Sequence, residues 1–92
     1  MPLVLLRPSI ISSSYSEPYG GWTDTFSAAG GLTLAAGVGI FNFVLGKGTN
    51  KGDLIPVDYV ANAIIASTAF YAKKPCFEVV TIGSSHQNPI NW

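Results

Sequence analysis

The chain has 92 residues, of which 48% are hydrophobic and only 11% are charged, and its formal net charge is zero. A typical soluble domain carries about 25% charged residues, so this composition predicts association with a membrane or a position inside a larger protein. The absence of a basic run argues against a nucleic-acid partner. Cys76 is the single cysteine, so we expect no internal disulfide and no zinc cluster, and a reducing compartment is favoured.

The first predicted element is a strand over residues 2–7, which read PLVLLR. Its apolar residues do not alternate with polar ones, which is typical of a strand buried on both faces of a parallel sheet. The run is too short for a secretory signal, and its arginine follows the apolar part. Pro8 and Ser9 end the strand. Because ligands of open α/β sheets bind at the carboxyl ends of strands, this corner is a candidate contact zone, although a plain strand end explains it equally well.

Residues 12–24 (SSSYSEPYGGWTD) are predicted to be a loop, since serines, a proline and two glycines interrupt any periodicity. Tyr15, Tyr19 and Trp22 are interleaved with them. Such aromatic residues either pack a loop onto the body of the protein or line an apolar ligand pocket, and packing is the commoner case.

Residues 25–46 contain no charged side chain. A stretch of this length could cross a bilayer, which takes about 20 apolar residues, but glycines and polar residues dilute its hydrophobicity. We therefore expect a short strand or turn at residues 32–36 and a helix at residues 39–45, with a membrane span kept open as the alternative. Residues 46–52 (GKGTNKG) are expected to be a flexible connector.

The most regular stretch is residues 53–71, which read DLIPVDYVANAIIASTAFY. Residues 54–55 are predicted to be extended, because Pro56 disfavours helical backbone in the residue before it. Asp58 is predicted to be the N-cap of a helix that begins at Tyr59, where a negative charge also suits the positive end of the helix dipole.

This predicted helix is apolar on nearly all sides, with Asn62, Ser67 and Thr68 as its interior polar residues. Two lysines and a proline at residues 73–75 are expected to end it. The face that repeats every three to four residues is Val60, Ile64, Ser67 and Tyr71. A helix so apolar is not a surface helix, and it requires cover on more than one side.

Residues 77–82 (FEVVTI) are predicted to be a second buried strand. A turn at residues 83–85 leads into a polar loop at residues 86–92. The chain is therefore expected to be an α/β piece, with a strand, an insertion, a helix and a strand, and with too few strands to close a sheet.

No stretch of the sequence provides a catalytic set. Residues 37–39 lack the third glycine of a dinucleotide turn, and residues 46–48 do not continue as a P-loop. Residues 83–87 lack the glycine that a nucleophile elbow needs. No tyrosine is followed four residues later by a lysine. Asp53 and Asp58 are open to interpretation as paired acids or metal ligands, but capping explains Asp58 better.

Four blocks carry a resemblance to a known family, and they occur in the family order. They are residues 2–11 (PLVLLRPSII), 17–24 (EPYGGWTD), 52–63 (GDLIPVDYVANA) and 83–92 (GSSHQNPINW). Together they resemble the alcohol-forming fatty acyl-CoA reductases, which are extended short-chain dehydrogenases/reductases with a male-sterility-type NAD-binding domain. The resemblance covers nearly the whole chain but only the later part of that family's reductase domain.

The resemblance implies an α/β fold, namely the C-terminal part of an extended Rossmann-like reductase domain together with elements of its substrate-side subdomain. Residues 1–92 would then be one partial NAD(P)-binding domain. The implied activity of the full-length enzyme is the NADPH-dependent reduction of long-chain acyl-CoA to a primary alcohol. The family's glycine turn and its Tyr/Lys pair lie upstream of the matched region, so the chain is expected to have no catalytic residue and no activity alone.

The resemblance also implies site residues. Pro8, Ser9 and Ile10 would lie beside the nicotinamide of the cofactor, and Trp22 would line the path of the acyl or pantetheine group. No metal is expected. Residues 37–45 are uncharged where the family usually has a basic residue, which argues against a contact there with the phosphates of coenzyme A.

By the same resemblance, the protein is expected inside the cell, at the membrane of the peroxisome or of the endoplasmic reticulum. Two alternatives remain open. One is a small membrane-associated protein without catalytic activity, and the other is a thioester reductase of the same superfamily that acts on a carrier-bound substrate.

Overall fold

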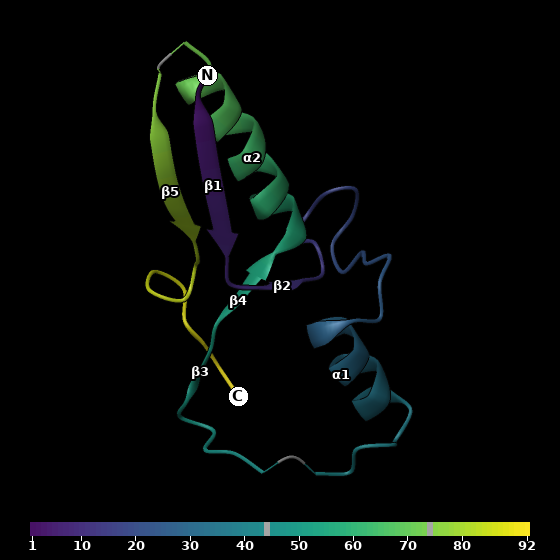
Figure 1. The fold of residues 1–92 in the computed structure, drawn as a ribbon. Coiled ribbons are helices and arrows are strands. Elements are labelled where there is room, and N and C mark those ends of the chain that lie inside the picture. Colours follow the sequence, from purple (N-terminus) through teal and green to yellow (C-terminus); the bar gives the residue numbers. More distant parts are fainter. Residues whose placement is uncertain (44, 74) are drawn as a thin grey trace.

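The computed structural model describes residues 1–43, 45–73 and 75–92. Over these residues the chain forms two helices and six short strands, and the strands pair into three two-stranded sheets (Figure 1). In chain order the elements are β1 (Leu3–Pro8), β2 (Ile10–Ser12), α1 (Ala28–Gly37), β3 (Lys51–Gly52), β4 (Leu54–Pro56), α2 (Val57–Tyr71), β5 (Phe77–Ile82) and β6 (Ile90–Asn91). Two residues in predicted elements, Val44 and Lys74, lie outside the described residues.

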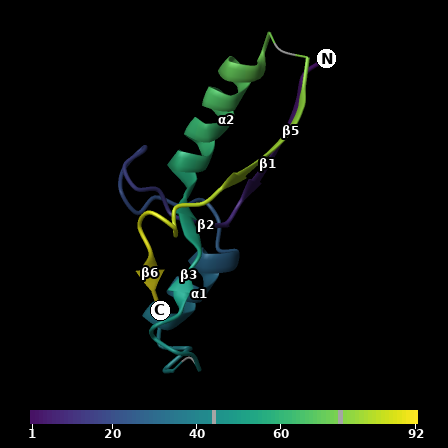
Figure 2. The same cartoon turned by 90° about the vertical axis from the view of Figure 1, so that its left-hand side faces the viewer.

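The two predicted buried strands are confirmed as β1 and β5, which pair in parallel. The helix α2 connects back to this pair and covers one of its faces (Figures 1 and 2). The expected burial on both faces is wrong, because Leu3 and Leu5 on the other face are 52% and 51% exposed. The fold is thus a small α/β unit with parallel strands, as part of a Rossmann-like domain would be.

β1 and β2 form one continuous path that changes its pairing partner at Ser9. The backbone N–H of Ser9 donates to the carbonyl of Ile82 at 2.9 Å, and the next N–H, of Ile10, donates to the carbonyl of Asp53 at 3.0 Å. From there β2 runs parallel to β4. Ser9 therefore lies where the carboxyl end of the β1–β5 pair meets the β2–β4 pair.

The helix predicted after residues 54–55 is confirmed, but the predicted N-cap is wrong. Pro56 is the N-cap, with extended backbone, because its fixed φ suits the residue before the first helical turn. Asp58 lies inside the first turn and is not the N-cap residue, although its charge still suits the positive end of the helix. Its carboxylate is therefore available to another part of the chain.

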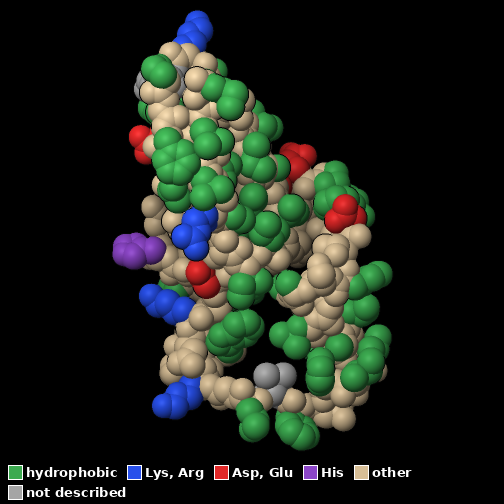
Figure 3. Space-filling view, viewed as in Figure 1, with side chains coloured by type: hydrophobic (Ala, Val, Ile, Leu, Met, Phe, Trp, Pro, Cys, Tyr) green, Lys and Arg blue, Asp and Glu red, His purple; other side chains and the backbone are tan. Residues whose placement is uncertain are grey.

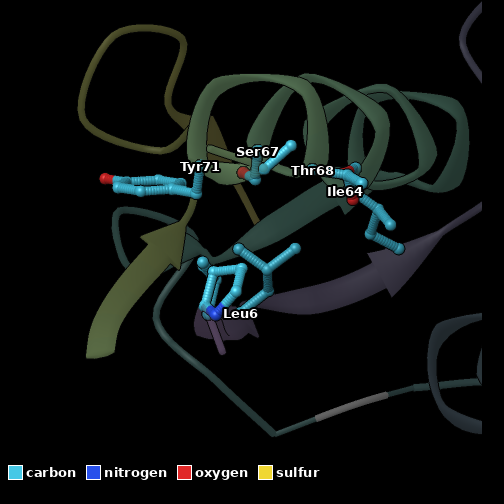
Figure 4. Close-up of a pocket in the computed structure, with 8 residues that line it drawn as sticks. Leu6, Ile64, Ser67, Thr68 and Tyr71 are labelled. Atoms are coloured by element: carbon cyan, nitrogen blue, oxygen red, sulfur yellow. The ribbon is translucent and has the colours of Figure 1, made fainter. Parts of the chain in front are cut away.

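The interface between α2 and β1 is loosely packed. Val60 near the start of α2 is buried, whereas further along the helix a cavity of about 240 Å³ remains between the two elements. Figure 4 shows Leu6 of β1 beneath the α2 side chains that border this cavity. Ser67 and Thr68 are too small to fill it, and the Thr68 hydroxyl donates back to the carbonyl of Ile64 at 2.8 Å. On the outer side of α2, Ile65 remains 67% exposed, so the helix has cover on one side only.

The expected structure of residues 32–45 is wrong. The helix α1 occupies Ala28–Gly37, and the described residues that follow it are not helical. Alanine and leucine favour helix within this stretch, and Gly39, with φ of 78°, allows a chain reversal that a helix at this position would not tolerate. In the described part of the chain, no helix has both the length and the hydropathy required to cross a membrane.

Two segments that were predicted to be irregular each contain a short strand near their C-terminal end. β3, in the predicted connector, pairs antiparallel with β6, in the predicted polar loop. The N–H of Trp92 extends the pairing by donating to the carbonyl of Asn50 at 3.1 Å. Strands of two residues are too short to produce an alternating pattern, so the sequence carries no signal for them.

The described chain is elongated and has little core. Its radius of gyration is 15.9 Å, against about 12 Å for a compact domain of this length. Ile55 and Val60 are its buried hydrophobic residues among those described. Hydrophobic side chains gather over the surface of α2 and around α1 (Figure 3). Such surfaces in a soluble protein are normally covered by further chain or by a partner.

This distribution predicts a large difference between two identical substitutions. Ile55→Ala removes a side chain that is 3% exposed and should lower the free energy of unfolding by about 2–5 kcal/mol. Ile65→Ala, on the exposed side of α2, should change it by less than about 0.5 kcal/mol. Urea unfolding of the 92-residue chain, followed by circular dichroism, measures both. Equal effects would show that the core does not centre on β4.

Candidate functional site

The loop between β2 and α1, which we name the closed loop, is held together by the buried Ser14. The hydroxyl of Ser14 donates to the carbonyl of Tyr19 at 2.6 Å and accepts from the N–H of Trp22 at 3.1 Å. The Ser14 backbone also binds the carbonyl of Trp22 and the N–H of Gly21, whose φ of 85° favours glycine. These bonds hold Trp22 next to the end of β2.

The same loop is fastened to α2 by the carboxylate of Asp58. Its two oxygens accept hydrogen bonds from three successive backbone N–H groups, of Tyr15, Ser16 and Glu17, at 3.0, 2.9 and 3.2 Å. The Tyr15 ring packs edge to face on Tyr59, with the centroids 5.8 Å apart. The packing role that the sequence suggested for the loop aromatics therefore holds for Tyr15.

The environment of Asp58 keeps it ionised. Burial of the side chain acts to raise its pKa, but the hydrogen bonds from the three loop N–H groups and from its own backbone outweigh burial and lower the pKa from 3.8 to about 2. Asp58 is therefore an anion that holds the loop, and its lowered pKa makes it a poor general base at neutral pH.

A cleft lies between β2, the closed loop and α1, and we name it the Trp22 cleft. Its volume is about 450 Å³. It brings together two residues that the family resemblance singled out, Ile10 and Trp22. The residues that line it are Ile10, Ile11, Ser12, Ser13, Trp22, Thr23, Asp24, Thr25, Ser27, Ala28, Gly30 and Val57. Its walls combine apolar side chains with several hydroxyl groups, which is typical of a small-molecule site.

Two glycines of α1 allow the loop to approach the helix closely. A Cβ at Gly30 would lie 2.9 Å from the carbonyl oxygen of Thr25, and a Cβ at Gly31 would collide with the carbonyl of Phe26. Any larger residue at these positions would push α1 away from the loop. The adjacent glycines therefore allow the segment before α1 to lie against the helix, beside the Trp22 cleft that Gly30 lines, whereas from the sequence they were expected only to dilute a hydrophobic stretch.

Pro8 and Ser9, the other two residues that the resemblance placed beside a cofactor, do not line the Trp22 cleft. They lie just before it, at the carboxyl end of β1. The hydroxyl oxygen of Ser9 is buried and has no hydrogen-bond partner among the described residues. A buried hydroxyl without a partner is unfavourable, so this atom is suited to a polar group of a bound molecule.

The two aspartates that could have formed an acid pair are engaged separately. Asp53 accepts a hydrogen bond from the hydroxyl of Ser85 at 2.6 Å, which ties the segment after β5 to the start of β4. Asp58 binds the loop on the other side of that strand. Among the described residues, no group of three or more His, Cys, Asp or Glu side chains could hold a metal ion.

Sequence reasoning missed the roles of Ser14 and Asp58 because both act on distant backbone groups. The serine run at residues 12–14 was interpreted as loop punctuation, and nothing in it marks Ser14 as the buried one. Asp58 follows a proline at the start of a helix. That position indicated a capping residue, so it did not point to a bond with the loop.

We expect the anchoring of the loop by Asp58 to depend on pH. Its folded pKa of about 2 lies below the ordinary 3.8, so its stabilisation is complete above about pH 4 and is lost as the pH falls through 2. The amide proton shifts of residues 15–17, measured by NMR, should therefore titrate together with a midpoint near pH 2. Asp58→Asn should abolish this titration and shift the three resonances toward disordered values at neutral pH.

Asp24→Asn is the matched control, because Asp24 is exposed and follows the same loop. It should leave the midpoint unchanged. A midpoint near pH 4 in the unmodified chain, or a titration that persists in Asp58→Asn, would contradict the anchoring role.

Comparison with known proteins gives a consistent result. The family model described as "Male sterility protein", an NAD-binding domain, matches residues 1–64. "Probable fatty acyl-CoA reductase 5" of Arabidopsis thaliana is 39% identical over 100% of this chain and 19% of its own length. "Fatty acyl-CoA reductase 8" of the same plant is 40% identical, and "Fatty acyl-CoA reductase 1" of Homo sapiens is 38% identical, each over 98% of this chain and 18% of its own length.

The chain thus spans about a fifth of the length of the curated relatives it matches. The matched residues include β1, the closed loop, α1 and the first half of α2, and so the whole Trp22 cleft. The chain therefore belongs to the male sterility family of NAD-binding domains and is homologous to a segment of the fatty acyl-CoA reductases.

Proposed function

We propose that this chain is the later part of the NAD(P)-binding domain of a fatty acyl-CoA reductase, which reduces long-chain acyl-CoA to a primary alcohol with NADPH. The observation that carries the proposal is the Trp22 cleft. It opens directly after the carboxyl end of β1, where a parallel sheet offers its ligand site, and it has an apolar wall for an acyl thioester.

The residues at the end of β1 fit a nicotinamide cofactor. Ser9 offers a buried hydroxyl that lacks a partner among the described residues, and it can bind a polar edge such as a carboxamide. Pro8 fixes the backbone before it and Ile10 provides an apolar side chain at the mouth of the cleft. When bound, the cofactor supplies the hydride.

Within the cleft, the remaining residues are proposed to hold the thioester. Trp22 provides a flat apolar surface that is fixed by Ser14, and Ile11 and Val57 extend that surface. These side chains exclude water from the reacting group, which favours reduction over hydrolysis. Asp58 acts as a positioning residue, because it holds the loop that carries Trp22.

The chain carries no Tyr/Lys pair for proton transfer and no glycine turn for the pyrophosphate. Both are proposed to come from parts of the protein outside these residues. By family resemblance, the proposed place of action is the membrane of the peroxisome or of the endoplasmic reticulum.

A chimera tests the proposal. Residues 1–92 replace the matching segment of a full-length fatty acyl-CoA reductase, and the product of palmitoyl-CoA with NADPH is identified by mass spectrometry. We expect hexadecanol, at a rate within about tenfold of the host enzyme. NADPH binding by the same chimera controls for folding. A chimera that binds NADPH but reduces no acyl-CoA would contradict the proposal, and a preference for an acyl-carrier thioester would favour the thioester reductase.

Trp22→Ala in this chimera tests the cleft. Loss of the indole removes its apolar contact with the substrate, so KM for palmitoyl-CoA should rise by about tenfold. KM for NADPH should stay unchanged. Tyr19→Ala is the control, because Tyr19 lies on the same loop and is exposed. An equal effect of the two substitutions would place the substrate elsewhere.

The isolated 92-residue chain should not bind NADPH measurably, because it has no glycine turn for the pyrophosphate. Equilibrium dialysis measures this directly. Tight binding would mean that the cofactor site lies within these residues.

A further inference from the structure

Three cavities contact α1 between Ala28 and Leu34. The Trp22 cleft contacts Ala28 and Gly30, and a second cavity of about 430 Å³ contacts Ala29, Thr33 and Leu34. These two cavities share the wall residues Ser12, Ser13, Thr23 and Gly30. A third cavity, of about 580 Å³, begins at Leu32. All three cavities border α1, and we name them together the α1 track, although the third shares no lining residue with the other two.

The third cavity differs in chemistry from the other two. Beyond Leu32, it is lined by Leu45, Gly46, Lys47, Gly48, Asn50 and Trp92. The space-filling view shows the hollow between α1 and this segment, with hydrophobic side chains around it (Figure 3). The turn that presents Lys47 is fixed by a hydrogen bond from the N–H of Asn50 to the Lys47 carbonyl at 2.9 Å.

Trp92 is positioned with an open aromatic face. Its ring lies on the buried Gly52, where a Cβ would be 3.4 Å from two ring atoms. The side chain is nevertheless 60% exposed, although it lines the cavity. An indole held on one side and open on the other is a platform on which a flat ring can stack.

The charged side chains at the two ends of the α1 track have opposite signs. Residues 25–46 carry no charge, so the charged residues that line the three cavities are Asp24 in the Trp22 cleft and Lys47 in the third cavity. A phosphate group is repelled at the Asp24 end and attracted at the Lys47 end. An uncharged acyl tail would gain no electrostatic interaction with Lys47.

We propose that the third cavity binds the adenosine bisphosphate end of a coenzyme A thioester, with the adenine on Trp92 and a phosphate on Lys47. The pantetheine arm then runs along α1 to the Trp22 cleft. This inference rests on the proposed function, since it takes acyl-CoA as the substrate.

The test compares two substrates in the chimera with a full-length reductase. S-palmitoyl-pantetheine carries the same thioester as palmitoyl-CoA but lacks the nucleotide. Lys47→Ala should raise KM for palmitoyl-CoA about three- to tenfold, which is the usual effect of losing a partly exposed phosphate contact. KM for S-palmitoyl-pantetheine should not change. Lys47→Arg should restore most of the affinity for palmitoyl-CoA.

Lys73→Ala is the matched control, because this exposed lysine follows the far end of α2 and should affect neither substrate. Adenosine 3′,5′-bisphosphate should inhibit the chimera competitively against palmitoyl-CoA, with an inhibition constant that Lys47→Ala raises by the same factor. An equal effect of Lys47→Ala on both substrates, or no effect on either, would overturn the inference while the proposed function stands.

If the chimera reduces neither substrate, the proposed function fails and binding decides the inference separately. Equilibrium dialysis of labelled adenosine 3′,5′-bisphosphate against the NADPH-bound chimera gives this readout. Binding that Lys47→Ala weakens and Lys73→Ala preserves supports the site. Absence of binding, or binding that is indifferent to Lys47, overturns it.

Discussion

The attachment of the 15–17 backbone to the carboxylate of Asp58 is the constraint on which the rest of the site depends. Three N–H groups that would otherwise be unpaired in a loop are satisfied by one buried anion. The anion in turn lies in the first turn of α2, where the helix dipole favours it. The position of the loop therefore depends on the position of the helix, and Trp22 is placed by the Asp58 anchor as well as by its own hydrogen bonds with Ser14.

The hydrophobic surplus of the chain has a related explanation. With 11% charged residues and a core centred on Ile55 and Val60, these residues alone bury little of their apolar surface. Further chain or a partner is expected to cover three surfaces. They are the open face of β1, the exposed side of α2 and the loosely packed α2–β1 interface. Homology to about a fifth of a longer reductase is consistent with cover from the rest of such a protein.

The predictable parts of the fold are those with a strong local signal. The apolar runs that became β1 and β5, and the proline followed by a periodic stretch that became α2, were all recognised. Residues 28–37 were not, because glycine and threonine lower helix propensity locally, while packing of the glycines on the loop stabilises the helix. The site was harder still. Ile10 and Trp22 came from the family resemblance, whereas the roles of Ser14 and Asp58 depend on hydrogen bonds to backbone groups elsewhere in the chain.

The pairing of β1 with β5 also affects how the protein is made. Among the described residues β1 pairs with β5, so the partner of Leu3 is Phe77, which follows much later in the chain. At about 5–20 residues per second, a ribosome leaves β1 without its partner for on the order of 4–15 s. During that time the edge of β1 that later pairs with β5 is open, and an unpaired apolar edge favours aggregation. Synthesis of this segment is therefore expected to need protection of β1 until β5 emerges.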